Sequence, residues 1–112
     1  MLSNISPRTL YLSASLFTAA EQAFNRGLAA ALRAAGYTVF LPQKIDQTQD
    51  QKVIFDLNVH ELKACDLVLA IVDGPDVDSG VAGEMGYAYA PGKPVVAVRT
   101  DFRQSGETMA PA

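Results

Sequence analysis

The sequence predicts an α/β fold, a doubly wound parallel sheet between two layers of helices (three-layer α/β/α). Two observations lead to this class. Apolar runs of strand length alternate with segments of helical periodicity in the order β-α-β-α-β-α-β. One segment, residues 67–74 (LVLAIVDG), opens with the uninterrupted apolar run that is typical of a central parallel strand covered on both faces. Since parallel strands need helical crossovers, this order favours a parallel sheet.

The first half of the chain predicts two strands around one helix. Residues 9–14 (TLYLSA) read as a short buried strand, and residues 37–42 (YTVFLP) as a second strand closed by Pro42. Between them, residues 15–36 have helical periodicity, and Gly36 stands where a helix stops. The apolar positions of this helix are Phe17, Ala20, Phe24, Leu28 and Leu32.

The second half predicts two more crossovers. Residues 43–51 form a polar loop, and residues 52–66 form an amphipathic helix that leads into the central strand. A glycine-rich helix begins near Ser79 and is stopped by Pro91, and residues 93–99 form a further strand. The remaining residues, 100–112, are turn-rich, so the predicted fold is apparently short at its C-terminus.

Length and composition suit one domain over residues 1–112, since 49% of the residues are hydrophobic and 19% are charged. The net charge is -3 and the nine basic residues are scattered, so neither a nucleic-acid polymer nor a membrane surface is an expected partner. A single cysteine and the lack of a signal or membrane-spanning segment favour the cytoplasm. With one His and one Cys, we expect no structural zinc site.

Ligands of such sheets bind at the carboxyl edge, near the point where the strand order reverses. The segments expected there are Ser13–Phe17, Gln43 onward, Asp73–Ser79 and Arg99–Arg103. This expectation follows from the fold class alone and does not define a function.

The glycine-rich helix surrounds one acid, Glu84, with glycines at every third position, Gly80, Gly83 and Gly86. Each interior glycine costs about 1 kcal/mol relative to alanine. Asp78 stands at the N-cap, and six residues bring Glu84 back over the same sector, so two carboxylates can line one pocket wall. Two alternatives remain open. The glycines can serve only tight helix–sheet packing, and the acids before the helix can form only a cap and a solvated turn.

Three stretches together resemble the nucleoside 2-deoxyribosyltransferase family: LYLSASLFT (10–18), LKACDLVLAIVDG (62–74) and DSGVAGEMGYA (78–88). The similarity runs from Tyr11 to about Arg103, and its most specific element is an aspartate six residues before a glutamate. The resemblance implies a flavodoxin-like fold and transfer of 2-deoxyribose between nucleobases by double displacement.

The resemblance implies specific roles for several residues. Glu84 matches the family's nucleophile, which holds the sugar as a covalent ester, and Tyr11 would donate a hydrogen bond to it. Asp78 matches the residue that binds the 5'-hydroxyl, where related 5'-monophosphate hydrolases tend to carry serine. Asn58 occupies the position of the group beside the leaving base, where many relatives have aspartate, and an amide cannot deliver a proton.

Further residues are expected to bind substrate. Gln43 would read the base edge, and Ser13 would shape the sugar pocket together with Phe17 and Gly80. No cofactor or metal is implied, because the enzyme itself carries the sugar. The expected partners are a 2'-deoxynucleoside, a free nucleobase and a second copy of the chain, as a homodimer or higher homo-oligomer.

Two rival functions remain open. The first is an N-glycoside hydrolase acting on 2'-deoxynucleoside 5'-monophosphates or nucleosides, in which water replaces the acceptor base. The second is a non-catalytic nucleotide-binding module on the same scaffold. One departure from the family pattern concerns the segment after the last strand, where relatives often carry an asparagine that reaches a neighbouring subunit; this sequence has none after Lys93.

Overall fold

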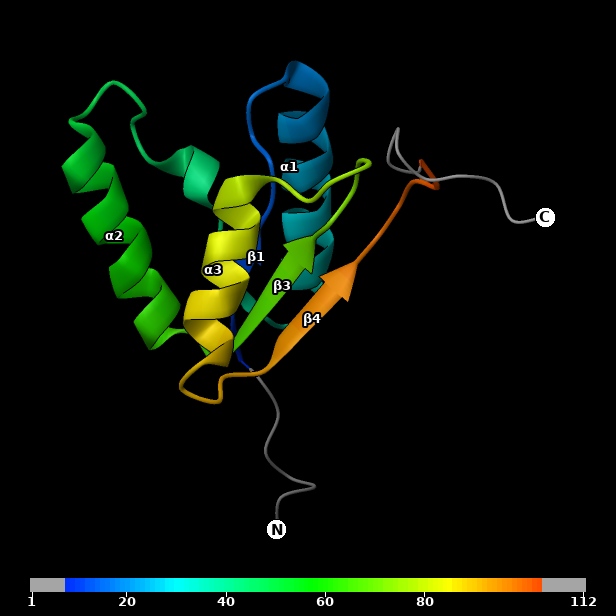
Figure 1. Ribbon diagram of the computed structural model, residues 1–112. Coiled ribbons are helices and arrows are strands. Elements are labelled where there is room, and N and C mark those ends of the chain that lie inside the picture. The colour runs from blue at the N-terminus through cyan, green and yellow to red at the C-terminus, as the bar shows by residue number, and fades with distance from the viewer. Residues whose placement is uncertain (1–7, 104–112) are drawn as a thin grey trace, which may run out of the picture.

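The computed structural model describes residues 8–103 and contains one sheet of four parallel strands (Figure 1). The strand order is β2-β1-β3-β4. Their bounds are Thr9–Ser13 for β1, Thr38–Phe40 for β2, Leu67–Ile71 for β3 and Val95–Val98 for β4. The prediction for residues 104–112 lies outside the described residues.

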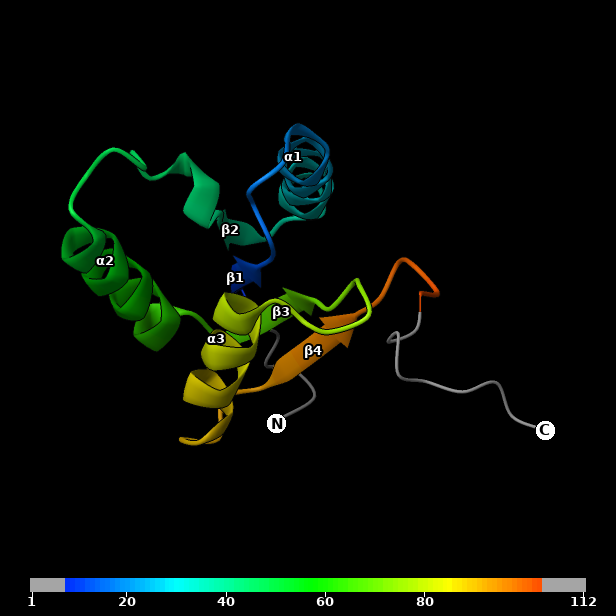
Figure 2. The same ribbon diagram turned by 45° about the horizontal axis from the view of Figure 1, so that its top comes forward.

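Helices lie on both faces of this sheet (Figure 2). Helix α1 (Ala19–Ala34) covers one face, while α2 (Gln51–Ala64) and α3 (Ser79–Tyr89) cover the other. From β1 the chain moves outward to β2, and from β3 it moves in the opposite direction to β4. The doubly wound, three-layer prediction is therefore confirmed, and the strand order reverses between β1 and β3.

Two hydrophobic clusters fill the two interlayer spaces. The cluster under α1 contains Leu10, Leu12, Ala29, Val39, Leu41 and Ile71. The cluster under α2 and α3 contains Tyr11, Leu62, Cys65, Val68 and Ala88. Because side chains alternate along a strand, β1 contributes to both clusters, and Tyr11 points to the layer that holds α3.

The first helix begins later than its periodicity predicts. Thr18 is the N-cap and forms a capping box with Glu21, so the residues before it are a loop rather than a first turn. Phe17 consequently lies outside the helix and is 76% exposed, and Phe24 is 46% exposed. Both were expected on the apolar stripe; the structure instead buries the polar residue Asn25.

Two smaller differences occur around β2. The strand has three residues, because Pro42 starts a short 3-10 helix, η2 (Pro42–Lys44), inside the predicted loop. Helix α2 begins at Gln51, where the side chain of Asp50 accepts a hydrogen bond from Lys52 N at 2.7 Å.

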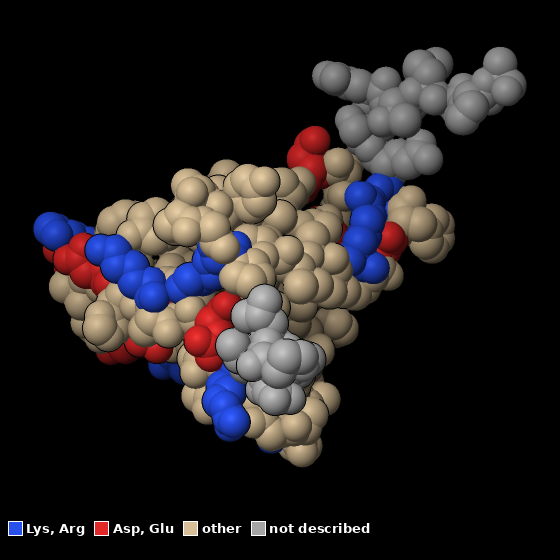
Figure 3. All heavy atoms as spheres, turned by 90° about the horizontal axis from the view of Figure 1, so that it is seen from below, with Lys and Arg blue, Asp and Glu red and all other residues tan. Residues whose placement is uncertain are grey.

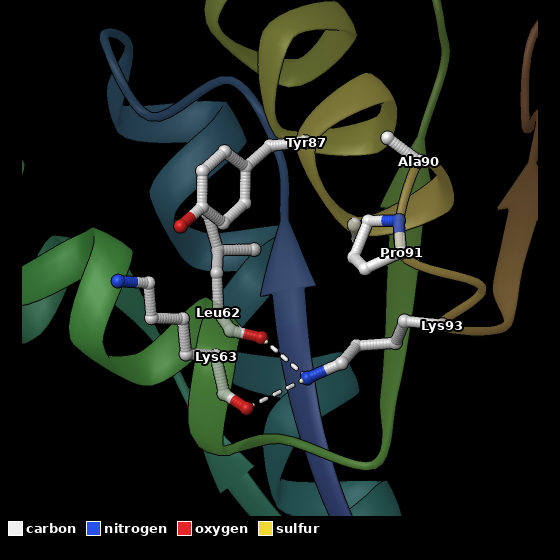
Figure 4. A pocket seen from close by; sticks show the side chains of 7 residues that line it. Leu62, Lys63, Tyr87, Ala90, Pro91 and Lys93 are labelled. Carbon is white, nitrogen blue, oxygen red and sulfur yellow. Dashed lines mark hydrogen bonds between the residues drawn. The ribbon is translucent and has the colours of Figure 1, made fainter.

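The α3–β4 connection is tied to the C-terminus of α2 by Lys93 (Figure 4). Its Nζ donates to the carbonyl oxygens of Leu62 at 2.6 Å, Lys63 at 3.0 Å and Cys65 at 2.6 Å. A cation at this end of a helix satisfies carbonyls that have no intrahelical partner. Lys93 therefore links the two helices that cover one face of the sheet.

We expect Lys93→Met to lower the free energy of unfolding by about 1–3 kcal/mol, because it removes hydrogen bonds from a charged donor to three carbonyls. Urea denaturation measures the change. Lys63→Met is the matched control, since it removes an exposed ammonium from the same corner and leaves the Lys63 carbonyl in place. Equal stability of the two variants would contradict the role of Lys93.

Charges of both signs are mixed on the face that Figure 3 shows, where Lys and Arg side chains lie beside Asp and Glu side chains with uncharged surface between the groups. Within residues 8–103, no helix combines the length and the apolar character needed to cross a membrane.

Candidate active site

Glu84 lies on α3 and points at the end of β1. Its carboxylate accepts two hydrogen bonds, from the Tyr11 hydroxyl to Oε2 at 2.5 Å and from the Ser13 hydroxyl to Oε1 at 2.6 Å. Tyr11 and Ser13 are both fully buried. They are two residues apart on β1, so their side chains point to the same face of the sheet. The sheet thus fixes both oxygens of one acid at the point where the strand order reverses.

Burial raises the pKa of Glu84, and the nearby charge of Asp78 adds to the rise. The hydrogen bonds from Ser13 and Tyr11 oppose this effect, because they stabilise the ionised form, but they do not cancel it. Burial, followed by the charge of Glu84, also raises the pKa of Tyr11, so its hydroxyl keeps its proton and remains a donor. The site therefore holds a carboxylate that is partly desolvated and fully hydrogen-bonded.

Glu84 borders a cavity of about 300 Å³ at the carboxyl edge of the sheet. Its lining comprises Ala14, Ser15, Leu16, Phe17, Pro42, Gln47, Gln51, Asn58, Asp78, Gly80, Val81 and Glu84. A second, more apolar cavity of about 320 Å³ lies between α2 and α3 and shares Asn58, Gly80 and Glu84 with the first. Glu84 therefore stands between a polar and an apolar space.

Asp78 is both the N-cap of α3 and part of the cavity wall. Its Oδ2 accepts a hydrogen bond from Val81 N at 3.1 Å. A Cβ on Gly80 would lie 3.1 Å from the same oxygen, so a side chain there would crowd the carboxylate. At Gly83 and Gly86 a Cβ would meet nothing within 4 Å. The glycines therefore do not serve tight packing against the sheet; Gly80 and Gly83 leave the cavity walls free of side chains.

Asn58 lines both cavities next to Glu84, whereas Gln43 lines neither of them. Asn58 on α2 faces both cavities, and its Oδ1 is buried without a hydrogen-bond partner among the described residues. The Gln43 amide is engaged in the protein, since its Oε1 accepts from Asn25 Nδ2 at 3.0 Å and its Nε2 donates to Gln22 O at 2.9 Å. The described cavity lining includes Pro42 but not Gln43.

The segment from Gln43 onward, which was expected at this edge, contributes Gln47 and Gln51 to the cavity lining, although neither was singled out as a site residue. Both follow η2, and Gln51 is the first residue of α2. Gln47 Nε2 donates to Ile45 O at 2.9 Å and to Pro42 O at 3.3 Å, which fixes the orientation of its amide. Glutamines are common in polar loops, so no sequence signal distinguished these two.

The remaining expected segments, Asp73–Ser79 and Arg99–Arg103, are tied to each other. Asp73 accepts hydrogen bonds from the backbone and hydroxyl of Thr100, and Gly74 N donates to Asp101 Oδ2 at 2.8 Å. Burial alone would raise the pKa of Asp73, but the hydrogen bonds from Thr100 outweigh it and lower this pKa. From these segments, Asp78 lies on the cavity lining.

A family model described as nucleoside 2-deoxyribosyltransferase matches residues 10–110. The chain belongs to the nucleoside 2-deoxyribosyltransferase family. The match includes the strand that carries Tyr11 and Ser13 and the helix that carries Glu84. No group of three or more His, Cys, Asp or Glu side chains that could hold a metal ion occurs between residues 8 and 103.

Solved structures share the fold of this family member. A conserved protein from Enterococcus faecalis V583 is 36% identical, with a TM-score of 0.77, over 91% of this chain and 69% of that one. A 2-deoxyribosyltransferase from Leishmania mexicana is 26% identical, with a TM-score of 0.75, over 87% and 67% of the two chains. A 2-deoxyribosyltransferase from Bacillus psychrosaccharolyticus has the same fold, with 24% identity and a TM-score of 0.74 over 91% and 77%. A comparison with curated proteins found no match.

Proposed function

We propose that this protein transfers 2-deoxyribose between nucleobases through a covalent deoxyribosyl ester of Glu84. The observation that carries the proposal is the Glu84 carboxylate, held by Tyr11 and Ser13 at the border of a 300 Å³ cavity. A carboxylate in this setting suits an oxocarbenium-like transition state, which develops positive charge at the anomeric carbon. Family membership supports the same reaction class.

The first displacement forms a bond between a Glu84 oxygen and C1' and breaks the bond from C1' to the base nitrogen. The electron pair of the broken bond leaves with the base, which takes a proton from water. In the second displacement a nitrogen of the incoming base attacks C1', the ester bond breaks, and the incoming base loses its proton to water. Two inversions restore the original configuration at C1'.

Asn58 supports base departure as a hydrogen-bond donor rather than as an acid. Its amide faces both cavities beside Glu84, and Nδ2 can donate to a ring nitrogen or carbonyl of the base. A neutral amide has no proton to transfer, so it lowers the barrier only by stabilising the developing negative charge. Gln47 and Gln51 line the same cavity and supply further polar groups for the base.

Asp78 would bind the sugar 5'-hydroxyl, and its charge would exclude a 5'-phosphate. We expect Asp78→Ser to raise the KM for a deoxynucleoside about tenfold, because a hydrogen bond to a charged group is lost. The same change should increase kcat/KM for the corresponding 5'-monophosphate, since a like charge beside the phosphate costs several kcal/mol.

Serine is the informative substitution, because it keeps the N-cap acceptor of α3 whereas alanine removes it. Asp76→Ser, two residues earlier in the same loop, is the control and should leave both substrates unaffected. If Asp78→Ser left the preference for nucleoside over monophosphate unchanged, the charge argument would fail.

The deciding assay supplies deoxyinosine with and without free adenine. Transfer predicts deoxyadenosine in the presence of adenine, and a mass increase of the protein by one deoxyribosyl group when no acceptor is present. Release of hypoxanthine at a rate that ignores adenine would instead establish the hydrolase. Binding of deoxyinosine without any turnover would establish a non-catalytic module.

We also propose that the protein acts as a homo-oligomer. Phe55 is 64% exposed and Tyr87 is 42% exposed, and both line the apolar cavity that reaches Glu84. A second copy would cover these rings. Light scattering after gel filtration measures the mass, and Phe55→Glu should shift it toward the monomer.

A further inference from the structure

The loop between β1 and α1, residues 14–18, contributes Ala14, Ser15, Leu16 and Phe17 to the lining of the 300 Å³ cavity. Side chains of α1 bind the backbone of this loop. On the amide side, Glu21 Oε1 accepts hydrogen bonds from Phe17 N and Thr18 N, both at 2.9 Å. On the carbonyl side, Gln22 Nε2 donates to Leu16 O at 2.8 Å. The backbone of this wall is therefore held from both directions.

Asn25 supplies the innermost of these contacts. It is 3% exposed, and its Nδ2 donates both to Ser15 O at 3.0 Å and to Gln43 Oε1 at 3.0 Å. Gln43 in turn donates from Nε2 to Gln22 O at 2.9 Å. A buried amide is costly unless it is hydrogen-bonded. The Asn25 amide uses both of its N–H groups to connect the β1–α1 loop to the segment after β2.

We propose that Asn25 is a positioning residue. It fixes the β1–α1 loop so that the Phe17 ring lies at the cavity, where it can contact the nucleobase. This inference rests on the proposed function for its substrate. The Phe17 ring is 76% exposed and lies on the cavity lining, so packing does not hold it and its place depends on the loop backbone. A wall that is already ordered binds a flat aromatic ligand without the entropic cost of ordering it.

The effect of Asn25 should fall on binding rather than on the chemical step. Glu84 is held by Tyr11 and Ser13, whose hydrogen bonds come from β1 and not from the loop. A loosened loop would therefore leave the nucleophile in place and weaken the contact with the base. In kinetic terms, KM should rise while kcat stays nearly constant.

The test is Asn25→Asp, which keeps the shape of the side chain and removes the donor. An aspartate oxygen in place of Nδ2 cannot donate to Ser15 O or Gln43 Oε1, so the loop should open more often. The amide hydrogens of Phe17 and Thr18 should then exchange about tenfold faster. Exchange at Val68 in β3 and Ala88 in α3 should remain unchanged. The KM for deoxyinosine should rise about tenfold with kcat within about twofold, the pattern of lost uniform binding. Arg26→Ala, the next residue on α1, is the control and should change none of these values.

Three results would overturn the proposal: unchanged exchange at Phe17 and Thr18, faster exchange at Val68 and Ala88 as well, or a fall in kcat with KM unchanged. If Asn25→Asp does not fold, Gln22→Ala removes the Leu16 contact from the same helix and must give the same local pattern. Because exchange is measured without turnover, it separates this inference from the proposed function. If the unmodified protein shows no activity, its affinity for deoxyinosine, measured by calorimetry, replaces KM. Absence of binding in that measurement would also overturn the inference.

Discussion

Replacing Glu84 by glutamine should lower kcat for base exchange by about 10³-fold or more, the scale expected when a covalent nucleophile is lost. The amide keeps the size of the side chain and can still accept a hydrogen bond from Tyr11. It cannot form a stable ester with C1', so no deoxyribosyl adduct should appear by mass spectrometry. Affinity for deoxyinosine should be retained, since the cavity lining is otherwise intact.

The control for this variant is Glu61→Gln, which makes the same chemical change on the neighbouring helix α2. It should retain full activity. Residual exchange by Glu84→Gln at even a tenth of the parental rate would exclude Glu84 as the nucleophile, whatever its position in the cavity.

Tyr11→Phe should have the second largest effect. A hydrogen bond to a charged group contributes about 1.5–3 kcal/mol, which corresponds to about 10- to 100-fold in rate if it is lost from the transition state. The hydroxyl of Tyr11 lowers the pKa of Glu84 against the effect of burial. Without it this pKa rises further. Because the proposed mechanism requires the ionised acid, the acidic limb of the kcat profile should move to higher pH.

Tyr89→Phe is the matched control, because that tyrosine lies on the same helix as Glu84 and is 75% exposed. Its pH profile should coincide with that of the parent. If Tyr11→Phe lowered kcat equally at every pH, the hydroxyl would serve only to orient Glu84, and the electrostatic part of the argument would fail.

The sequence was most informative where periodicity is strong. The apolar run of β3 and the helix–strand alternation were enough to predict the parallel sheet, because few other folds accommodate a strand buried on both faces. The pairing of Glu84 with Tyr11 could be anticipated only through the family resemblance. Residues 73 positions apart meet here because β1 lies beside β3, which local patterns do not encode.

The sequence was least informative at the loops. The helical periodicity extends back to Phe17, but the capping box formed by Thr18 and Glu21 makes the helix begin after Thr18. Gln43 was expected at the base, yet in the structure a buried asparagine, Asn25, binds its amide. Such polar pairs depend on which loops the fold brings together, so the partner of Gln43 or Asn25 cannot be predicted from the local sequence.

Helix α3 carries three glycines in eleven residues, and a peptide of this composition would have little tendency to coil in water. What keeps it helical is the N-cap at Asp78 and the burial of Val81 and Ala88. The position of Glu84, the proposed nucleophile, therefore depends on the fold as a whole. On heating, catalytic competence should vanish together with the tertiary structure and not ahead of it, so thermal inactivation would report directly on the melting of the whole sheet.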